Sequence, residues 1–135
     1  MYMYYFAYGL NLSKKQMAER CPNSKPKFSA VLPNYKLIFV GWSRQLKGGI
    51  ASIKPFKGEK VSGAVYEITE SDMKKLDRFE DYPTVYNRFN IKVWTEDGDP
   101  VEAVTYIKNE QSPETKPSPE VLNVIRQGYR EWEIE

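Results

Sequence analysis

The sequence predicts an α+β fold in which a mainly antiparallel β-sheet closes into a small barrel. Short segments rich in β-branched and aromatic residues alternate with turn signals such as Asp97-Gly98, which is typical of antiparallel strands. In the segment 61–68, apolar residues occupy both alternating sets of positions, as expected for a sheet that is covered on both faces or closes on itself. Three segments that begin with Ser or Thr caps indicate helices.

Length and composition favour a single domain over residues 1–135, since a chain of this size can bury a substantial core. Hydrophobic residues make up 41% of the chain, which argues against disorder. The 20 Lys and Arg nearly balance the 18 Asp and Glu, so we expect neither nucleic acid nor a membrane as the main partner. We find no apolar run of membrane-spanning length and no signal-peptide pattern, and we therefore expect a cytoplasmic protein of open oligomeric state.

The chain contains no His and a single Cys, Cys21. A Ser-His-Asp or Cys-His nucleophile is therefore excluded, as are a structural zinc cluster of Cys and His and an intramolecular disulfide. We expect no metal and no cofactor. Any acid–base chemistry must rely on carboxylates, Lys or Tyr.

The N-terminal stretch combines a strand, a tight loop and the start of a helix. Aromatic residues alternate through residues 2–8, Gly9 allows the backbone to turn, and Ser13 can cap a helix. In the loop 9–12, backbone N–H groups lack helical partners and lie at the positive end of the helix dipole. The stretch Tyr8 to Leu12 is thus a candidate site for a carboxylate or an oxyanion, or else a plain strand–helix junction.

Two pairs of predicted strands follow, each pair joined by a turn. Residues 28–32 and 35–40 flank Pro33-Asn34, and residues 50–54 and 61–68 flank the turn 55–58. Between the pairs, the segment 41–49 contains two adjacent glycines and is interpreted as a flexible connector. Whether residues 43–49 close over a ligand is left open.

The second predicted helix carries the best candidate for a general base. Thr69 can cap this helix, with Asp72 at the third position. Met73, Leu76 and Glu80 recur at helical spacing, which places the Glu80 carboxylate on the apolar, core-facing stripe. A carboxylate on the buried side is costly unless it is used or satisfied. The alternative is a helix-end carboxylate that either frays outward or pairs with Arg78 or Arg88.

Two neighbouring carboxylates have weaker claims to a role. Asp77 and Asp81 are expected on a solvated surface. After a loop at 82–86, residues 88–94 and 101–107 form a predicted hairpin, in which Tyr86, Arg88, Trp94 and Tyr106 either line a pocket or simply pack.

The end of the chain reads as a loop and a helix. Residues 108–117 form a mobile loop, with an open question of whether it acts as a lid. Ser118 caps the final helix, Gly128 closes it, and Val121, Leu122 and Ile125 form its buried stripe.

In this order and spacing the motifs resemble the gamma-glutamylcyclotransferase-like family, which includes the AIG2-like and gamma-glutamylamine cyclotransferase proteins. The resemblance covers most of the chain. The family's Tyr-Gly-Ser-Asn-Leu corresponds to Tyr8-Gly9-Leu10-Asn11-Leu12, and its Leu-Asp-x-x-Glu-Gly corresponds to Leu76-Asp77-Arg78-Phe79-Glu80-Asp81. The remaining matches are Arg20-Cys21-Pro22, Gly63-Ala64-Val65-Tyr66-Glu67-Ile68, Tyr86-Asn87-Arg88, Ala103-Val104-Thr105-Tyr106 and Lys116-Pro117-Ser118.

The resemblance implies a small antiparallel barrel with helices packed outside, and an enzyme acting on a small gamma-glutamyl substrate. Glu80 would take a proton from the α-ammonium group, and the freed amine would attack its own γ-carbonyl to give 5-oxoproline and an amine. Such a closure needs no protein nucleophile, metal or His. The implied site comprises Glu80 as the catalytic residue, with Tyr8, Gly9, Leu10, Asn11, Leu12, Tyr86, Arg88 and Tyr106 as substrate-binding residues.

Two departures from the family pattern leave alternatives open. Leu10 replaces a Ser, which removes a hydroxyl from the loop, and Asp81 replaces a Gly beside the presumed base. Glutathione, a gamma-glutamyl amino acid, gamma-glutamyl-lysine and other amine conjugates all remain possible substrates. A small-molecule binding or regulatory module that keeps the pocket without turnover is the rival hypothesis, and a nucleic-acid-binding barrel is a third that the near-neutral charge disfavours.

Overall fold

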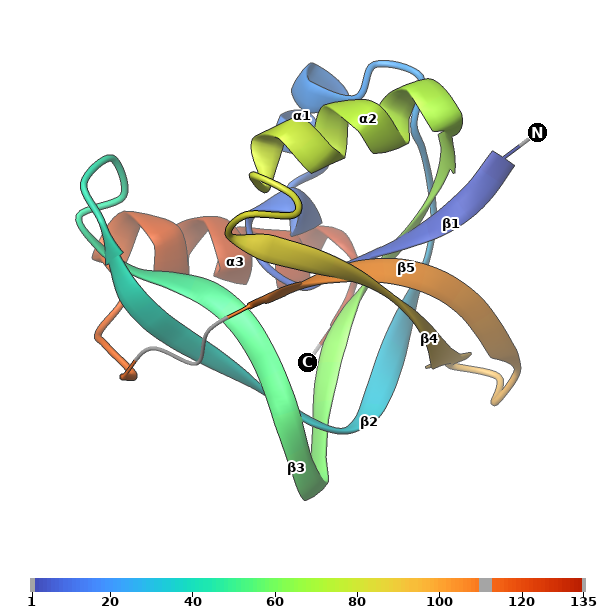
Figure 1. Ribbon diagram of the computed structural model, residues 1–135. Helices are drawn as coiled ribbons and strands as arrows, with labels where there is room; N and C mark the ends of the chain where they lie inside the picture. The colour runs from blue at the N-terminus through green and yellow to red at the C-terminus, as the bar shows by residue number, and fades with distance from the viewer. Residues whose placement is uncertain (1, 110–112, 135) are drawn as a thin grey trace.

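The computed structural model describes residues 2–109 and 113–134, and it contains five strands, three α-helices and one short 3₁₀ turn within that range (Figure 1). The elements in chain order are β1 (Tyr2–Ala7), η1 (Leu10–Leu12), α1 (Lys14–Arg20), β2 (Lys25–Ser43), β3 (Gly48–Thr69), α2 (Glu70–Phe79), β4 (Tyr86–Thr95), β5 (Pro100–Lys108) and α3 (Pro119–Glu131).

The five strands form a closed barrel in the order β1-β3-β2-β4-β5. Four of the contacts between neighbouring strands are antiparallel, with β2 and β3 forming the longest pair. The barrel closes where β1 runs parallel to β5, with Tyr5 opposite Val104. The predicted fold class, a mainly antiparallel barrel with helices outside, is confirmed.

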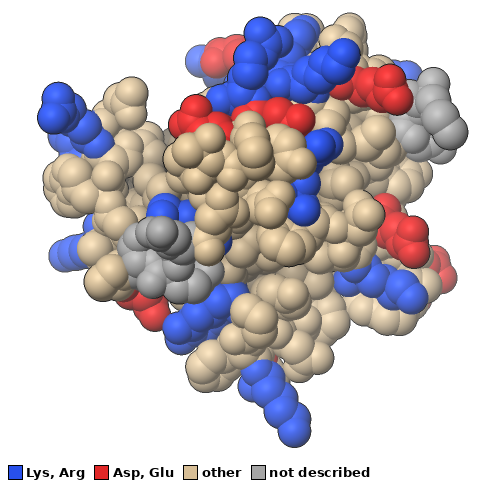
Figure 2. Space-filling model, in the orientation of Figure 1, with Lys and Arg blue, Asp and Glu red and all other residues tan. Residues whose placement is uncertain are grey.

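The helices lie outside the barrel, with α1 and α2 at the top of the view in Figure 1 and α3 below them. Each begins at the predicted cap: Ser13 Oγ accepts from Gln16 N, Thr69 forms a capping box with Asp72, and Ser118 Oγ accepts from Val121 N. Lys and Arg side chains gather over α1 and α2 in Figure 2, with acidic side chains directly beneath them. Both signs of charge therefore meet on this face.

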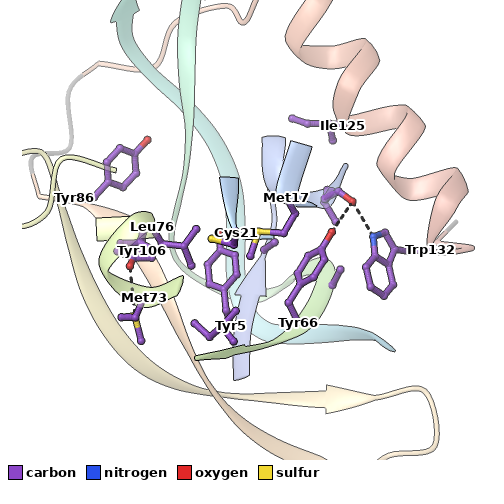
Figure 3. Packing of buried hydrophobic residues seen from close by; sticks show 14 of the residues in the cluster. Tyr5, Met17, Cys21, Tyr66, Met73, Leu76, Tyr86, Tyr106, Ile125 and Trp132 are labelled. Atoms are coloured by element: carbon purple, nitrogen blue, oxygen red, sulfur yellow. Dashed lines mark hydrogen bonds between the residues drawn. The ribbon is translucent and has the colours of Figure 1, made fainter. Parts of the chain in front are cut away.

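Alternation along the strands builds two cores. Phe6 in β1 and Tyr8 directly after it belong to the cluster inside the barrel, together with Ile53 and Val93. Tyr5 and Ala7 face the other way and join the cluster that packs the barrel against the helices. Figure 3 shows this second cluster, where Tyr5, Tyr66 and Tyr106 meet side chains of the helices. The sheet is therefore apolar on both faces because it is a barrel with an outer layer.

Two predicted turns are wrong, because the strands run straight through them. Pro33-Asn34 lies inside β2 and residues 55–58 lie inside β3. Asn34 and Gly58 do adopt positive φ angles, of 62° and 91°, but these produce an irregularity in the β2–β3 register rather than a chain reversal. Asn34 Oδ1 accepts a 3.1 Å hydrogen bond from Gly58 N across the pair, which holds the two irregular positions together.

The segment predicted as a flexible connector is mostly strand. β2 extends to Ser43 and β3 starts at Gly48, so the tip of the hairpin is short. Gly48 and Gly49 are buried, because a Cβ on either would fall within 3 Å of the chain at 115–118. The described part of the predicted mobile loop 108–117 is also held in place: Gly49 N donates to Lys116 O and Thr115 N donates to Phe39 O, while residues 110–112 lie outside the described range.

The predicted end of the last helix is also wrong. The helix α3 continues past Gly128 to Glu131. A Cβ at Gly128 would lie 2.6 Å from Leu12 Cβ, so the glycine is there for a close approach and not for a helix end. No helix in the described residues is long and apolar enough to cross a membrane.

Candidate active site

A cavity of about 580 Å³ opens between the N-terminal loop, the tip of the β2–β3 hairpin and the C-terminal end of α2. Its size is in the range of small-molecule sites. Most of the residues predicted for a site lie on it, namely Tyr8, Gly9, Leu10, Asn11, Glu80, Tyr86 and Tyr106. It is also lined by residues that were not predicted for the site, among them Tyr5, Arg20, Trp42, Arg44 and Leu46.

Glu80 is the residue that immediately follows α2. Its N–H donates to Leu76 O at 2.9 Å, so the last helical turn fixes the direction in which the carboxylate leaves the helix. Burial raises the pKa of this carboxyl from 4.5 to about 7, with a further increase from the neighbouring Asp81 and an opposing decrease from Arg20. A carboxylate with a pKa near 7 is well suited to accept a proton at neutral pH.

The loop before α1 presents backbone donors to the same cavity. Within the described residues, the N–H groups of Gly9, Leu10 and Asn11 have no hydrogen-bond acceptor, since the 3₁₀ turn uses only the N–H groups of Leu12 and Ser13. A Cβ at Gly9 would lie 3.2 Å from Ala51 Cβ, so glycine lets the loop pack closely against β3. The loop therefore combines open donors with a fixed position.

Asn11 connects this loop to a cation that sequence reasoning missed. Its Nδ2 donates to the Tyr5 hydroxyl at 3.0 Å, and its Oδ1 accepts from Arg20. The guanidinium of Arg20 also lies over the Phe79 ring, 3.7 Å from its centroid. Arg20 lies three positions after the buried Met17 on α1, a spacing that would have placed it on the inner face of the helix.

Arg20 forms no ion pair with a carboxylate among the described residues. Burial lowers its pKa, and the nearby Glu80 acts in the opposite direction. A partly buried guanidinium held by an amide and an aromatic ring keeps its charge available for an anion in the cavity.

The tyrosines of the cavity are held by hydrogen bonds that their hydroxyls donate. Tyr8 donates to Tyr106 O and Tyr86 donates to Ala51 O, at 2.5 and 2.7 Å. Burial raises the pKa of both hydroxyls above the ordinary value for tyrosine, so they remain neutral. They shape the wall of the cavity and are poor candidates for the base.

Two residues predicted for the site do not line the cavity. Leu12 is completely buried, and its carbonyl accepts hydrogen bonds from Tyr66 and Trp132, at 3.3 and 2.8 Å (Figure 3). Arg88 lies behind the wall, where its Nε is 3.3 Å from Asp77 Oδ1 and its guanidinium lies over the Tyr82 ring. Both residues hold elements that form the wall of the cavity, and neither lines the cavity itself. Both were predicted for the site from the family resemblance, because they belong to motifs that also contain residues of the cavity.

Asp77 also departs from expectation. It is partly buried, accepts a hydrogen bond from the Tyr106 hydroxyl and pairs with Arg88, so it is not a solvated surface carboxylate. Asp81 is exposed as expected, although it lies at the rim of the cavity with a positive φ of 51°. In the described residues, no group of three or more His, Cys, Asp or Glu is placed to hold a metal ion.

The model of the family described as "Gamma-glutamyl cyclotransferase, AIG2-like" matches residues 5–130. The chain belongs to this family. It is 34% identical over 134 residues to the gamma-glutamylcyclotransferase of Mus musculus, which covers 94% of the chain and 70% of that relative. It is 43% identical over 54 residues to the gamma-glutamylaminecyclotransferase of Mus musculus, covering 37% of the chain and 36% of the relative.

A solved structure described as "Gamma-glutamyl cyclotransferase" superposes with a TM-score of 0.93 at 28% identity, covering 98% of the chain and 80% of that structure. The expected family is confirmed, and so is an enzyme of the gamma-glutamylcyclotransferase type at the level of the family. One relative is named a gamma-glutamylcyclotransferase and the other a gamma-glutamylaminecyclotransferase, so family membership leaves the leaving group undecided.

Proposed function

We propose that this protein converts a gamma-glutamyl amide into 5-oxoproline and a free amine, with Glu80 as the general base. One observation carries the proposal: a carboxyl group with a pKa of about 7 lines the same cavity as the open N–H groups of Gly9, Leu10 and Asn11. The carboxylate can remove a proton, and the N–H groups can stabilise negative charge.

The reaction requires little from the protein beyond these groups. Glu80 takes a proton from the α-ammonium group of the substrate, and the freed nitrogen attacks the γ-carbonyl carbon of the same molecule. The attack forms the C–N bond of the new ring, and the C–N bond between the γ-carbonyl carbon and the leaving amine then breaks. The two protons that the attacking nitrogen loses balance the two that the departing amine gains, so no other reactant is needed. Holding both reacting ends within one cavity supplies the entropic advantage of an intramolecular attack.

The charges of the cavity suggest where the substrate lies. Arg20 provides a cation for the α-carboxylate of the glutamyl group, held in place by Asn11. The N–H groups of the 9–11 loop are then available to the oxyanion that develops on the γ-carbonyl oxygen, or to the same carboxylate. Each well-placed group of this kind contributes on the order of 10² to 10⁴ in rate.

The test is release of 5-oxoproline from a pool of gamma-glutamyl amides, detected by mass spectrometry. We expect the wild type to release it and Glu80→Gln to release none above background. Glu70→Gln is the matched control, because it makes the same change at an exposed position at the start of α2. Equal turnover by the wild type and Glu80→Gln would refute the assignment of the base.

The rival function is a binding module that holds a gamma-glutamyl compound without turning it over. Leu10 favours it, because an apolar side chain lines the cavity where the family pattern has a hydroxyl. A ligand that binds and is recovered intact after prolonged incubation would support this rival.

A further inference from the structure

We propose that Trp42 and Arg44, at the tip of the β2–β3 hairpin, form the subsite for the leaving group and select one that carries a carboxylate, as an amino acid does. This inference rests on the proposed function and specifies its substrate class. Both residues line the cavity that contains Glu80, on a different wall from the 9–11 loop and α2.

Trp42 is the first residue that points to a ligand. Its side chain is 70% exposed, the largest value among the large hydrophobic residues of the described chain. It makes no aromatic or cation contact in that range, although tryptophan usually buries most of its surface. An exposed indole at the mouth of a cavity is well suited to cover an apolar part of a bound molecule.

Arg44 supplies charge on the same wall. It is exposed, and within the described residues it has no salt-bridge partner. The cavity contains two carboxylates, Glu80 and Asp81, and both follow α2. Arg44 thus lines the cavity and has no salt bridge to a protein carboxylate in the described residues, so its guanidinium is a match for a carboxylate of the ligand.

The tip that carries these two residues is held in a defined shape. Ser43 accepts hydrogen bonds from Leu46 N and Lys47 N, at 3.1 and 2.7 Å. Leu46 packs against the cluster between the barrel and the helices, and Gly48 lies against the backbone at 116–118. Figure 1 shows the tip standing out from the barrel, at the end of the long β2–β3 pair. The subsite is therefore a built wall whose position is fixed by packing.

The substrate has two different halves, the glutamyl group and the leaving group, and each can be placed against one wall of the cavity. The glutamyl half must lie against Glu80, Arg20 and the loop donors, because the attack takes place there. The other half of the amide then extends toward the remaining wall, which is the hairpin tip. An amino acid leaving group presents a carboxylate to Arg44 and a side chain to Trp42. An alkylamine leaving group leaves Arg44 unmatched.

The experiment compares two substrates that differ only in that carboxylate, gamma-glutamyl-phenylalanine and gamma-glutamyl-phenethylamine. We expect Arg44→Gln to raise KM for the first about tenfold, the loss of one charged hydrogen-bonded contact, with kcat little changed and KM for the second unaltered. We expect Trp42→Ala to raise KM for both, since both carry the ring. Lys47→Gln is the matched control, because it removes the same charge from the same tip at a residue that does not line the cavity.

The proposal is overturned if Arg44→Gln raises KM equally for the two substrates. It is also overturned if Lys47→Gln raises KM for the phenylalanine substrate as much as Arg44→Gln does, because that result would indicate a general attraction of anions. The proposed function is tested separately by wild-type turnover. Should the wild type release no 5-oxoproline from these two substrates or from the pool, that function fails, and calorimetric binding of the two compounds to Glu80→Gln decides on the subsite. A preference for the phenylalanine compound that disappears in the Arg44→Gln, Glu80→Gln double variant supports the subsite, and no preference refutes it.

Discussion

The hydroxyl of Tyr106 donates a 2.6 Å hydrogen bond to Oδ1 of Asp77, which ties strand β5 to helix α2 directly behind the wall of the cavity. Arg88 on β4 pairs with the same oxygen, so three elements meet at one carboxylate. Because Asp77 precedes Glu80 by a single helical turn, this junction determines where the end of α2 lies. The proposed base is thus positioned by a contact between strand β5 and helix α2.

Loss of this contact should weaken the fold. We expect Tyr106→Phe to reduce the free energy of unfolding by about 1.5 to 3 kcal/mol, since a hydrogen bond to a buried charged group is removed. Tyr129→Phe is a suitable control, because the Tyr129 hydroxyl, which is partly buried, makes no hydrogen bond within the described residues. Urea denaturation measures both, and equal stability of Tyr106→Phe and the wild type would contradict the prediction.

The rate should depend on pH through Glu80. The base acts in its ionised form, so kcat/KM should rise as pH increases through about 7 and then level off. Asp81 raises this pKa, and Asp81→Asn should therefore move the rising limb to lower pH. Initial rates from pH 5 to 8 measure the shift. An unchanged limb in the variant would mean that the Asp81 charge does not act on the base.

The same carboxylate should cost stability at neutral pH. A pKa raised from 4.5 in the unfolded chain to about 7 in the fold means that the folded state binds the proton more tightly. Stability from this group therefore falls as pH rises from about 4.5 to about 7, by about 3 kcal/mol in all. We expect Glu80→Gln to be more stable than the wild type at pH 8, and the gain to vanish near pH 4. Thermal or chemical unfolding at both pH values tests this, and a gain that persists at pH 4 would argue for a packing effect.

Gly128 should resist substitution by alanine even though it lies inside a helix. A Cβ there would approach Leu12 Cβ to 2.6 Å, and overpacking of this kind costs about 1 to 3 kcal/mol, more than the improved helix propensity returns. Asn123→Ala, at an exposed position of α3, should instead be neutral or stabilising. The melting temperatures of the two variants make the comparison, and equal values would show that Leu12 can move aside.

Short sequence patterns correctly predicted the starts of the helices, because these depend on residues that are close together in the chain. The caps at Ser13, Thr69 and Ser118 are where the sequence placed them. Helical spacing also predicted the side on which Glu80 lies, and this residue lines the cavity directly after the last turn of α2. The turn residues were less informative. A positive φ at Asn34 serves a strand irregularity as readily as a reversal, and only the partner strand decides between them.

Other features depend on contacts between distant parts of the chain. Asp77 looks exposed on a helical wheel, and it is the approach of Tyr106 and Arg88 from two strands that covers it. The hairpin tip reaches the cavity through the barrel topology, which no short motif encodes, whereas the spacing from Met17 on α1 could have indicated that Arg20 lies on the inner face. The family motifs placed Leu12 and Arg88 in the site, whereas Leu12 is buried in the core and Arg88 pairs with Asp77.

The donation from Trp132 to the carbonyl of Leu12 spans 120 positions of sequence, and barrel closure joins Tyr5 to Val104. The loop that faces the cavity therefore acquires its support only after residues as far along the sequence as Trp132 have been synthesised. Such long-range closure predicts slow folding, with β1 and its outward-facing tyrosines left uncovered on the nascent chain. The N-terminal loop is therefore completed by segments about 100 positions later in the sequence, and it can bind a ligand only once those segments have packed against it.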